Sequence, residues 1–126
     1  MTQEFVPYEL AVKLKALGFN EPCLGGYIRF RGSGSFELAF YKYRNVDFNT
    51  TSNIYVSAPL YQQAFRWFRE KYGLFIQPNR TIDSEGTWYY FSIASKRTDV
   101  CEGSFVYEEA ELACLDKLIE MTHPNK

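Results

Sequence analysis

Few side chains in this sequence combine the chemistry and the setting that catalysis requires. The only histidine is His123, which lies close to the C-terminus. A catalytic triad or a zinc site needs an imidazole that its surroundings hold in one orientation, and a position near a chain end does not supply them. The sequence therefore predicts neither histidine-based catalysis nor a metal site that uses histidine.

The three cysteines, Cys23, Cys101 and Cys114, form no Cys-x-x-Cys pair. A reactive thiolate needs an activating base or a positive environment, and neither is evident around Cys23 or Cys101. Cys114 falls on the buried side of an expected helix, so we interpret it as a core residue. Because the cysteine number is odd and the N-terminus resembles no secretory leader, we expect reduced thiols in a cytosol.

Paired carboxylates and phosphate-binding loops are two further patterns that would indicate catalysis. No pair among the 15 acidic residues is singled out by its setting. The segment Gly32-Ser33-Gly34 lies between two expected strands and lacks the remaining residues of a dinucleotide or nucleotide-phosphate loop. We therefore predict no catalytic residue, no cofactor-binding residue, no metal ligand and no cofactor, and we expect that the protein is not an enzyme.

The balance of charge argues against a strongly cationic nucleic-acid binder. Lysine and arginine number 14, aspartate and glutamate number 15, and the formal net charge is −1. Proteins that bind nucleic acid derive much of their affinity from neutralising phosphates. Aromatic residues make up 18% of the chain. We interpret most of them as core, because aromatic rings carry large apolar area; the alternative is an exposed aromatic surface for a partner.

Two alternating runs, at residues 27–31 and 36–44, are separated by glycine and serine and predict a β-hairpin. A three-residue loop at residues 33–35 would pair Phe30 with Leu38 and Tyr27 with Tyr41. This register gathers apolar side chains on one side of the pleat, as a buried face requires. The other side then carries the candidate nucleic-acid or partner surface, which consists of Tyr27, Arg29, Arg31, Tyr41 and Tyr43.

This aromatic and arginine surface has two interpretations. Rings interleaved with arginine can bind a single strand of nucleic acid by stacking on bases and contacting phosphates. Alternatively, the same residues form cross-strand pairs that stabilise a solvated sheet face, which is the interpretation we favour. The glycine spacing around residues 31–38 is that of an RNA-recognition motif, but its base-stacking positions hold Ser33, Ser35 and Leu38, so we reject that motif.

Hydrophobic periodicity and the positions of proline and glycine predict the remaining elements. Helices are expected at residues 7–17, 59–71 and 107–122, and further strands at 54–56, 74–77 and 87–94, with a loop at 78–86 and a polar connection at 95–103. We predict a single α+β domain over residues 1–126. Its strands should form one antiparallel sheet with about three helices on one face.

The phrase Tyr-x-x-Ala occurs at Tyr8, Tyr61 and Tyr107, in the first turn of each expected helix. Three uses in three helices favour a role in construction over three ligand sites. A small alanine lets a helix approach a sheet closely, while the tyrosine covers the corner between strand and helix. The copies at Tyr61 and Tyr107 each follow expected strands, so we also predict an internal ββα duplication.

Two segments, residues 64–72 (AFRWFREKY) and 107–119 (YEEAELACLDKLI), resemble small uncharacterised proteins of phages, prophages and mobile elements of Bacteroides and their relatives. In that family a Trp-Phe/Leu-Arg-Glu-Lys helix precedes a short β region and a closing Tyr-Glu-Glu-Ala helix. The hairpin at residues 27–44 is not part of the resemblance. The family has no assigned activity, so the resemblance implies a bacterial cytosol and an accessory role, and it supplies no catalytic residue.

These observations lead to one functional hypothesis and two alternatives. We expect a non-enzymatic interaction module in the cytoplasm that binds another protein or a second copy of itself. The first alternative is a single-stranded nucleic-acid binder that uses the hairpin surface, and the second is an enzyme of unknown reaction. No apolar run approaches the length that a bilayer span requires, so we expect no membrane partner.

Overall fold

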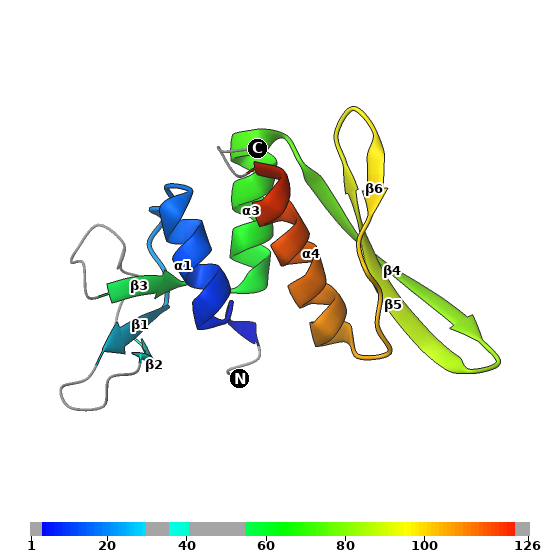
Figure 1. The fold of residues 1–126 in the computed structure, drawn as a ribbon, viewed down its shortest axis with the longest axis horizontal. Helices are drawn as coiled ribbons and strands as arrows, with labels where there is room; N and C mark the ends of the chain where they lie inside the picture. The colour runs from blue at the N-terminus through cyan, green and yellow to red at the C-terminus, as the bar shows by residue number, and fades with distance from the viewer. Residues whose placement is uncertain (1–3, 30–35, 41–54, 123–126) are drawn as a thin grey trace. The chain divides into compact units, whose positions relative to one another are not determined.

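The computed structural model describes residues 4–29, 36–40 and 55–122 (Figure 1). The chain divides into two compact units, Met1–Gln62 and Gln63–Lys126. Both units combine helix with antiparallel strands, so the predicted α+β class is confirmed. The single domain over residues 1–126 stays a prediction.

The first unit contains helix α1 (Tyr8–Ala16) and the strands β1 (Gly25–Arg29), β2 (Phe36–Phe40) and β3 (Tyr55–Ala58). Pro7 caps the N-terminus of α1, as expected from a residue with no N–H to leave unpaired. At the other end Gly18 takes a positive φ of 96°, and Phe19 N–H donates to the carbonyl of Leu14 at 3.0 Å. A glycine in this conformation is a common helix stop, and the Phe19 side chain that follows it is buried.

The register of the first hairpin differs from the expected one. β1 lies between β2 and β3, and Tyr27 pairs with Leu38 where the sequence pattern favoured Tyr41. This shift is three positions, and an odd shift exchanges the two faces of a strand. The strand begins earlier than expected, at Gly25, where the Phe5 ring packs so closely that an added Cβ would lie 3.1 Å from it. β1 pairs with β3 as well as with β2, so its register depends on a distant strand and not only on the hairpin loop.

The second unit contains α4 (Tyr107–Thr122), most of α3 (Tyr61–Tyr72) and the strands β4 (Phe75–Asp83), β5 (Gly86–Ala94) and β6 (Thr98–Val100). The strands form an antiparallel sheet in the order β4-β5-β6. The bounds of α4 are those predicted, and α3 begins two residues later than expected. The core of the second unit consists of large apolar side chains from α3, α4 and β5: Phe65, Phe68, Phe91, Ile93, Leu115 and Leu118.

The expected single sheet is wrong. The described strands form two three-stranded sheets, one in each unit. The ββα duplication is likewise not supported, because the two sheets differ in topology: the first strand, β1, is central in one, and the second strand, β5, is central in the other. The sequence pattern marks where strands occur but carries little information about which distant strands pair.

Two further differences concern β4 and β6. The expected loop at residues 78–86 is instead mostly strand, since β4 continues through Pro78 to Asp83. A proline lacks an N–H for the ladder, and it is tolerated here because β4 is an edge strand. The polar connection at residues 95–103 contains β6, a strand of three residues whose alternation is too short to detect.

The three Tyr-x-x-Ala phrases begin the three described helices, as predicted. Tyr8, Tyr61 and Tyr107 are the first residues of α1, α3 and α4. The alanines of the three phrases, Ala11, Ala64 and Ala110, are fully buried. Leu112 of α4 shares the apolar periodicity of Leu115 and Leu118 but is 40% exposed. No helix within the described ranges is long and apolar enough to cross a bilayer.

Candidate functional site

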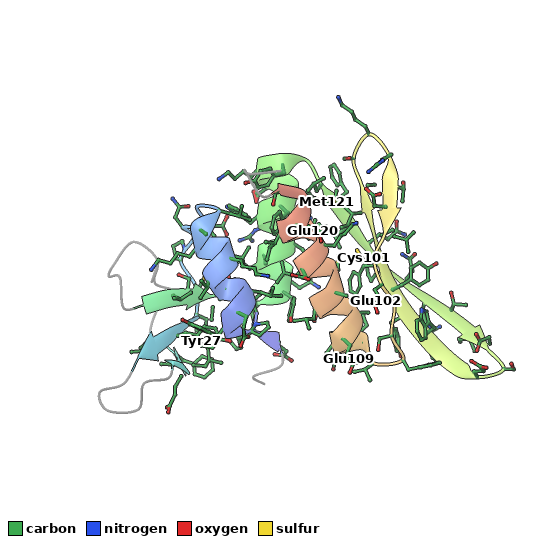
Figure 2. The ribbon with its side chains drawn as sticks, in the orientation of Figure 1. Tyr27, Cys101, Glu102, Glu109, Glu120 and Met121 are labelled. Atoms are coloured by element: carbon green, nitrogen blue, oxygen red, sulfur yellow. The ribbon has the colours of Figure 1, made fainter. Side chains whose placement is uncertain are left out.

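Tyr27 is the first residue of the predicted hairpin surface, and its side chain is held by contacts within the first unit. Its hydroxyl donates a hydrogen bond to the carbonyl oxygen of Val6 at 2.7 Å. Its ring contacts Tyr8 edge-on, with centroids 5.5 Å apart (Figure 2 labels Tyr27 on β1). Burial raises the pKa of Tyr27, and the charge of Glu9 raises it further. A phenol anchored at both its ring and its hydroxyl is poorly suited to stack on a nucleobase.

The remaining members of that surface are not described. Arg29 is the last residue of β1. Arg31, Tyr41 and Tyr43 lie outside the described residues. That the five residues form one surface therefore stays a prediction. The observed register pairs Tyr27 with Leu38 and not with Tyr41.

A second candidate surface is the face of the β4-β5-β6 sheet that points away from α3 and α4. The helices contact the opposite face, where the Phe91 ring lies 5.8 Å from Phe65 of α3 and 5.6 Å from Tyr107 of α4. Side chains alternate along a strand, so the register assigns the residues between these contacts to the other side. We call that side the outer face; it consists of Phe75, Gln77, Asn79, Thr81, Trp88, Tyr90, Ser92, Ala94, Thr98 and Val100.

The outer face carries no charged residue over these ten positions. Beyond them, the closing pair of the hairpin adds Asp83, whose carboxylate accepts the N–H of Glu85 at 2.8 Å and so belongs to the turn. Asn79 donates to the hydroxyl of Ser92 at 3.2 Å across the strands. A solvated sheet face normally carries charges, so an uncharged one with exposed apolar side chains suggests contact with a partner.

Two large apolar side chains stand on the edge strands of this face. Phe75 on β4 is 59% exposed and Val100 on β6 is 64% exposed. Between them the central strand contributes only the small side chains Ser92 and Ala94, which pair with Val100 and Phe75 respectively. At this end of the sheet, the outer face is therefore raised at its edges and low along its centre.

Trp88 extends the outer face toward the turn. Its indole makes an edge-to-face contact with Phe105, whose centroid lies 4.6 Å away and whose side chain is 52% exposed. The indole also lies directly on Gly103, where an added Cβ would overlap indole Nε1. Trp88 thus occupies the space that a side chain at residue 103 would need.

Cys101 and Cys114 are a third group with distinctive chemistry. Both are buried, and their side chains are hydrogen-bonded to each other. Cys114 is a core residue of α4, as predicted, whereas the contact with Cys101 was not foreseen. The sequence offers little signal for it, because 13 positions separate the two cysteines and one of them follows an undetected strand.

The acidic residues at the start of α4 have structural partners. Glu109 accepts a hydrogen bond from the Ser104 hydroxyl at 2.6 Å, and the same hydroxyl accepts the N–H of Val106 at 3.1 Å (Figure 2). Glu108 and Glu109 lie in the first turn, where the helix dipole favours negative charge. Within the described part of the chain, no three histidine, cysteine or acidic residues are grouped as a metal site would require.

The outer face was missed because β6 was not recognised and only the first residues of β4 were assigned to a strand. With residues 78–86 assigned to a loop, Trp88 and Tyr90 had no partner strand on which a continuous face could be built. The available signal was the alternation of uncharged residues at Phe75, Gln77 and Asn79, which continues through the proline.

Comparison with known proteins finds no family model, no curated protein and no solved structure that matches this chain.

Proposed function

We propose that this chain is a non-enzymatic protein-interaction module and that the outer face of β4, β5 and β6 is its binding surface. The observation that carries the proposal is the pair Phe75 and Val100, both more than half exposed on a sheet face without charge. Covering one such side chain with a partner contributes about 1–3 kcal/mol, so two of them account for a useful share of an ordinary affinity.

The chemistry of the outer face favours a protein over a nucleic acid. A nucleic-acid surface needs lysine or arginine to neutralise phosphates, and the outer face contains neither. Its polar residues are amides and hydroxyls, which suit the rim of a protein interface. The Trp88 and Tyr90 side chains add partly exposed aromatic area, a residue type enriched where proteins bind one another.

We also propose that the module works in a bacterial cytosol as an accessory protein of phage or mobile-element type. This part of the proposal rests on the resemblance of residues 64–72 and 107–119 to proteins of that kind. The low net charge and the absence of a paired cysteine motif in the sequence are compatible with it.

Affinity capture of a partner tests the proposal. The full chain is immobilised and exposed to cytosolic lysate with and without nuclease, alongside the double variant Phe75→Ser, Val100→Ser. Ile82→Ser is the matched control, because Ile82 is 65% exposed on the same sheet but occupies the opposite face in the register. We expect a protein that survives nuclease treatment, with affinity reduced at least about tenfold by the double variant and unchanged by the control.

Self-association is measured in the same series by sedimentation equilibrium, since a second copy of the chain is one of the partners considered. Capture that nuclease abolishes would replace the proposal with the nucleic-acid alternative. A captured protein that binds the double variant as tightly as the unchanged chain would remove the outer face from the proposal. A chain that stays monomeric and captures no protein contradicts the proposed function itself.

A further inference from the structure

Two thiols from separate elements meet in the interior of the second unit. Cys101 directly follows β6 and is 5% exposed, and Cys114 lies in α4 and is fully buried. Their side chains are hydrogen-bonded to each other, and Figure 2 labels Cys101 beside α4. The third cysteine, Cys23, belongs to the first unit, where its thiol donates to the carbonyl of Glu21.

The backbone on both sides of Cys101 is fixed to β5. Its N–H donates to the carbonyl of Phe91 at 2.8 Å, and Ser104 exchanges two hydrogen bonds of 2.8 Å with Tyr89. On the other side of the pair, α4 packs on β5 through Tyr107, which contacts both Tyr89 and Phe91. The two sulfurs are therefore held together by elements that share β5 as a common support.

Electrostatics gives the two thiols different roles. The hydrogen bond from the Cys114 S–H lowers the pKa of Cys101, and Lys117 lowers it further, while burial and Asp99 act in the opposite direction. The pKa of Cys114 is raised far above its usual range by the same hydrogen bond and by burial, with Cys101 and Glu111 adding to the effect. Cys101 is thus the thiol of the pair that loses its proton more readily, and Cys114 the one that retains it.

We propose that Cys101 and Cys114 are a modification site for small oxidants of the peroxide class and that they form a reversible intramolecular disulfide. The Cys101 thiolate attacks one peroxide oxygen, the O–O bond breaks, and Cys101 becomes a sulfenic acid while the departing hydroxide is protonated to water. The Cys114 sulfur then attacks the Cys101 sulfur, the S–O bond breaks, and the hydroxyl group leaves with the Cys114 proton as a second water. In sum, two thiols and one peroxide give one disulfide and two waters.

Access for the oxidant comes from the edge of the sheet. β6 is an edge strand with only three paired residues, Thr98–Val100, and it ends at Cys101. Opening this short segment breaks few hydrogen bonds and exposes the thiolate to a molecule as small as hydrogen peroxide. A dithiol reductant restores the pair by thiol–disulfide exchange. The disulfide ties the end of β6 to α4, independently of whether the outer face binds a protein.

Peptide mapping of the full chain tests this inference. The native protein is treated with hydrogen peroxide, its remaining thiols are alkylated, and it is digested with trypsin. Cleavage after Arg97 and Lys117 leaves both cysteines in one peptide, residues 98–117. We expect this peptide to be two hydrogens lighter and unalkylated, and to become fully alkylated when the protein is reduced first. Further digestion after Glu102 and Glu108 cuts the chain between Cys101 and Cys114. The two resulting fragments should separate only after the disulfide is reduced.

Three variants assign the roles. Cys114→Ala should leave Cys101 as a sulfenic acid that a dimedone probe labels, Cys101→Ala should abolish both products, and Cys23→Ser should leave the disulfide unchanged. A native chain in which residues 98–117 stay fully reduced under peroxide, or in which Cys101 becomes linked to Cys23, overturns the inference. Because the linkage is read in the unchanged protein, the result stands even where a variant fails to fold.

Discussion

At the scale of single residues, Tyr27 illustrates how a side chain of functional type can be structural. The sequence presents it as an exposed ring beside arginines. In the structure its hydroxyl donates to Val6 and its ring contacts Tyr8, so the residue joins β1 to the segment that begins α1. For this reason the Tyr27 ring is not available for stacking on the predicted hairpin surface.

Tyr27→Phe should destabilise the protein by about 0.5–1.5 kcal/mol at neutral pH, because the hydrogen bond to Val6 is lost. Burial raises the folded pKa of Tyr27 above the ordinary value of 10.0, so the neutral phenol stabilises the fold below pH 10. That contribution is lost as pH rises from 10 through the raised folded pKa. Urea unfolding at neutral and alkaline pH measures the free energy of unfolding. Between the two pH values this free energy should fall less in Tyr27→Phe than in the unchanged chain.

Two comparisons complete that measurement. Tyr72→Phe controls for the loss of a hydroxyl at an exposed position of α3. Some loss of stability at alkaline pH should persist in Tyr27→Phe, because burial also raises the pKa of Tyr107. Glu111, Glu108 and Cys114 raise the pKa of Tyr107 further. Equal alkaline losses in Tyr27→Phe and the unchanged protein would show that Tyr27 is not buried as described.

At the scale of elements, the Tyr-x-x-Ala phrase is a device for starting helices against strands. In α1 the first residue, Tyr8, contacts Tyr27 of β1 with centroids 5.5 Å apart and planes at 81°. In α4 the first residue, Tyr107, contacts Tyr89 of β5 with the same spacing and angle. A strand tyrosine and a helix tyrosine thus meet edge-on in both units, while the alanine one turn later lets the helix approach closely.

Ala64→Leu and Ala110→Leu should each destabilise the protein by about 1–3 kcal/mol, because both alanines are fully buried and a larger side chain overpacks the contact. Ala113→Leu is the matched control, since this residue is only partly buried on the same helix as Ala110. Urea unfolding midpoints measure the effect. Midpoints for Ala64→Leu and Ala110→Leu that match the control would mean that these alanines do not line a tight contact.

At the scale of the whole molecule, each compact unit has a set of buried side chains of its own. In the second unit these come from α3, β5 and α4, and the boundary between the units falls within the first turn of α3. A fragment that retains the whole of α3 therefore keeps every element of the second unit.

Residues 59–126 are expected to fold without the preceding residues. The fragment contains the Phe65, Phe91 and Leu115 core, although its small size implies low stability. Circular dichroism should show helix and a cooperative thermal transition. A fragment that lacks a cooperative transition, while the full chain retains one, would instead favour the single domain over residues 1–126 that the sequence predicts.

The helices could be predicted from the sequence almost to the residue, because their signals are local. Pro7 and Gly18 bound α1, Gly73 with a φ of 68° follows α3, and the acidic first turn of α4 suits its dipole. The core position of Cys114 followed from the same helical periodicity. By contrast Leu112 follows the same periodicity on that helix and is exposed, since periodicity alone does not say how wide the covered face is.

The amino-acid sequence by itself determined the α+β class, the three helix starts and most strand positions, since these depend on neighbours a few residues apart. Only the tertiary structure decided what depends on distant pairing. The first register belongs to a strand that pairs with both β2 and β3, and the edge position of β4 let that strand pass through Pro78. The outer face and the contact between Cys101 and Cys114 belong to this second group, because each joins residues that only strand pairing and helix packing bring together.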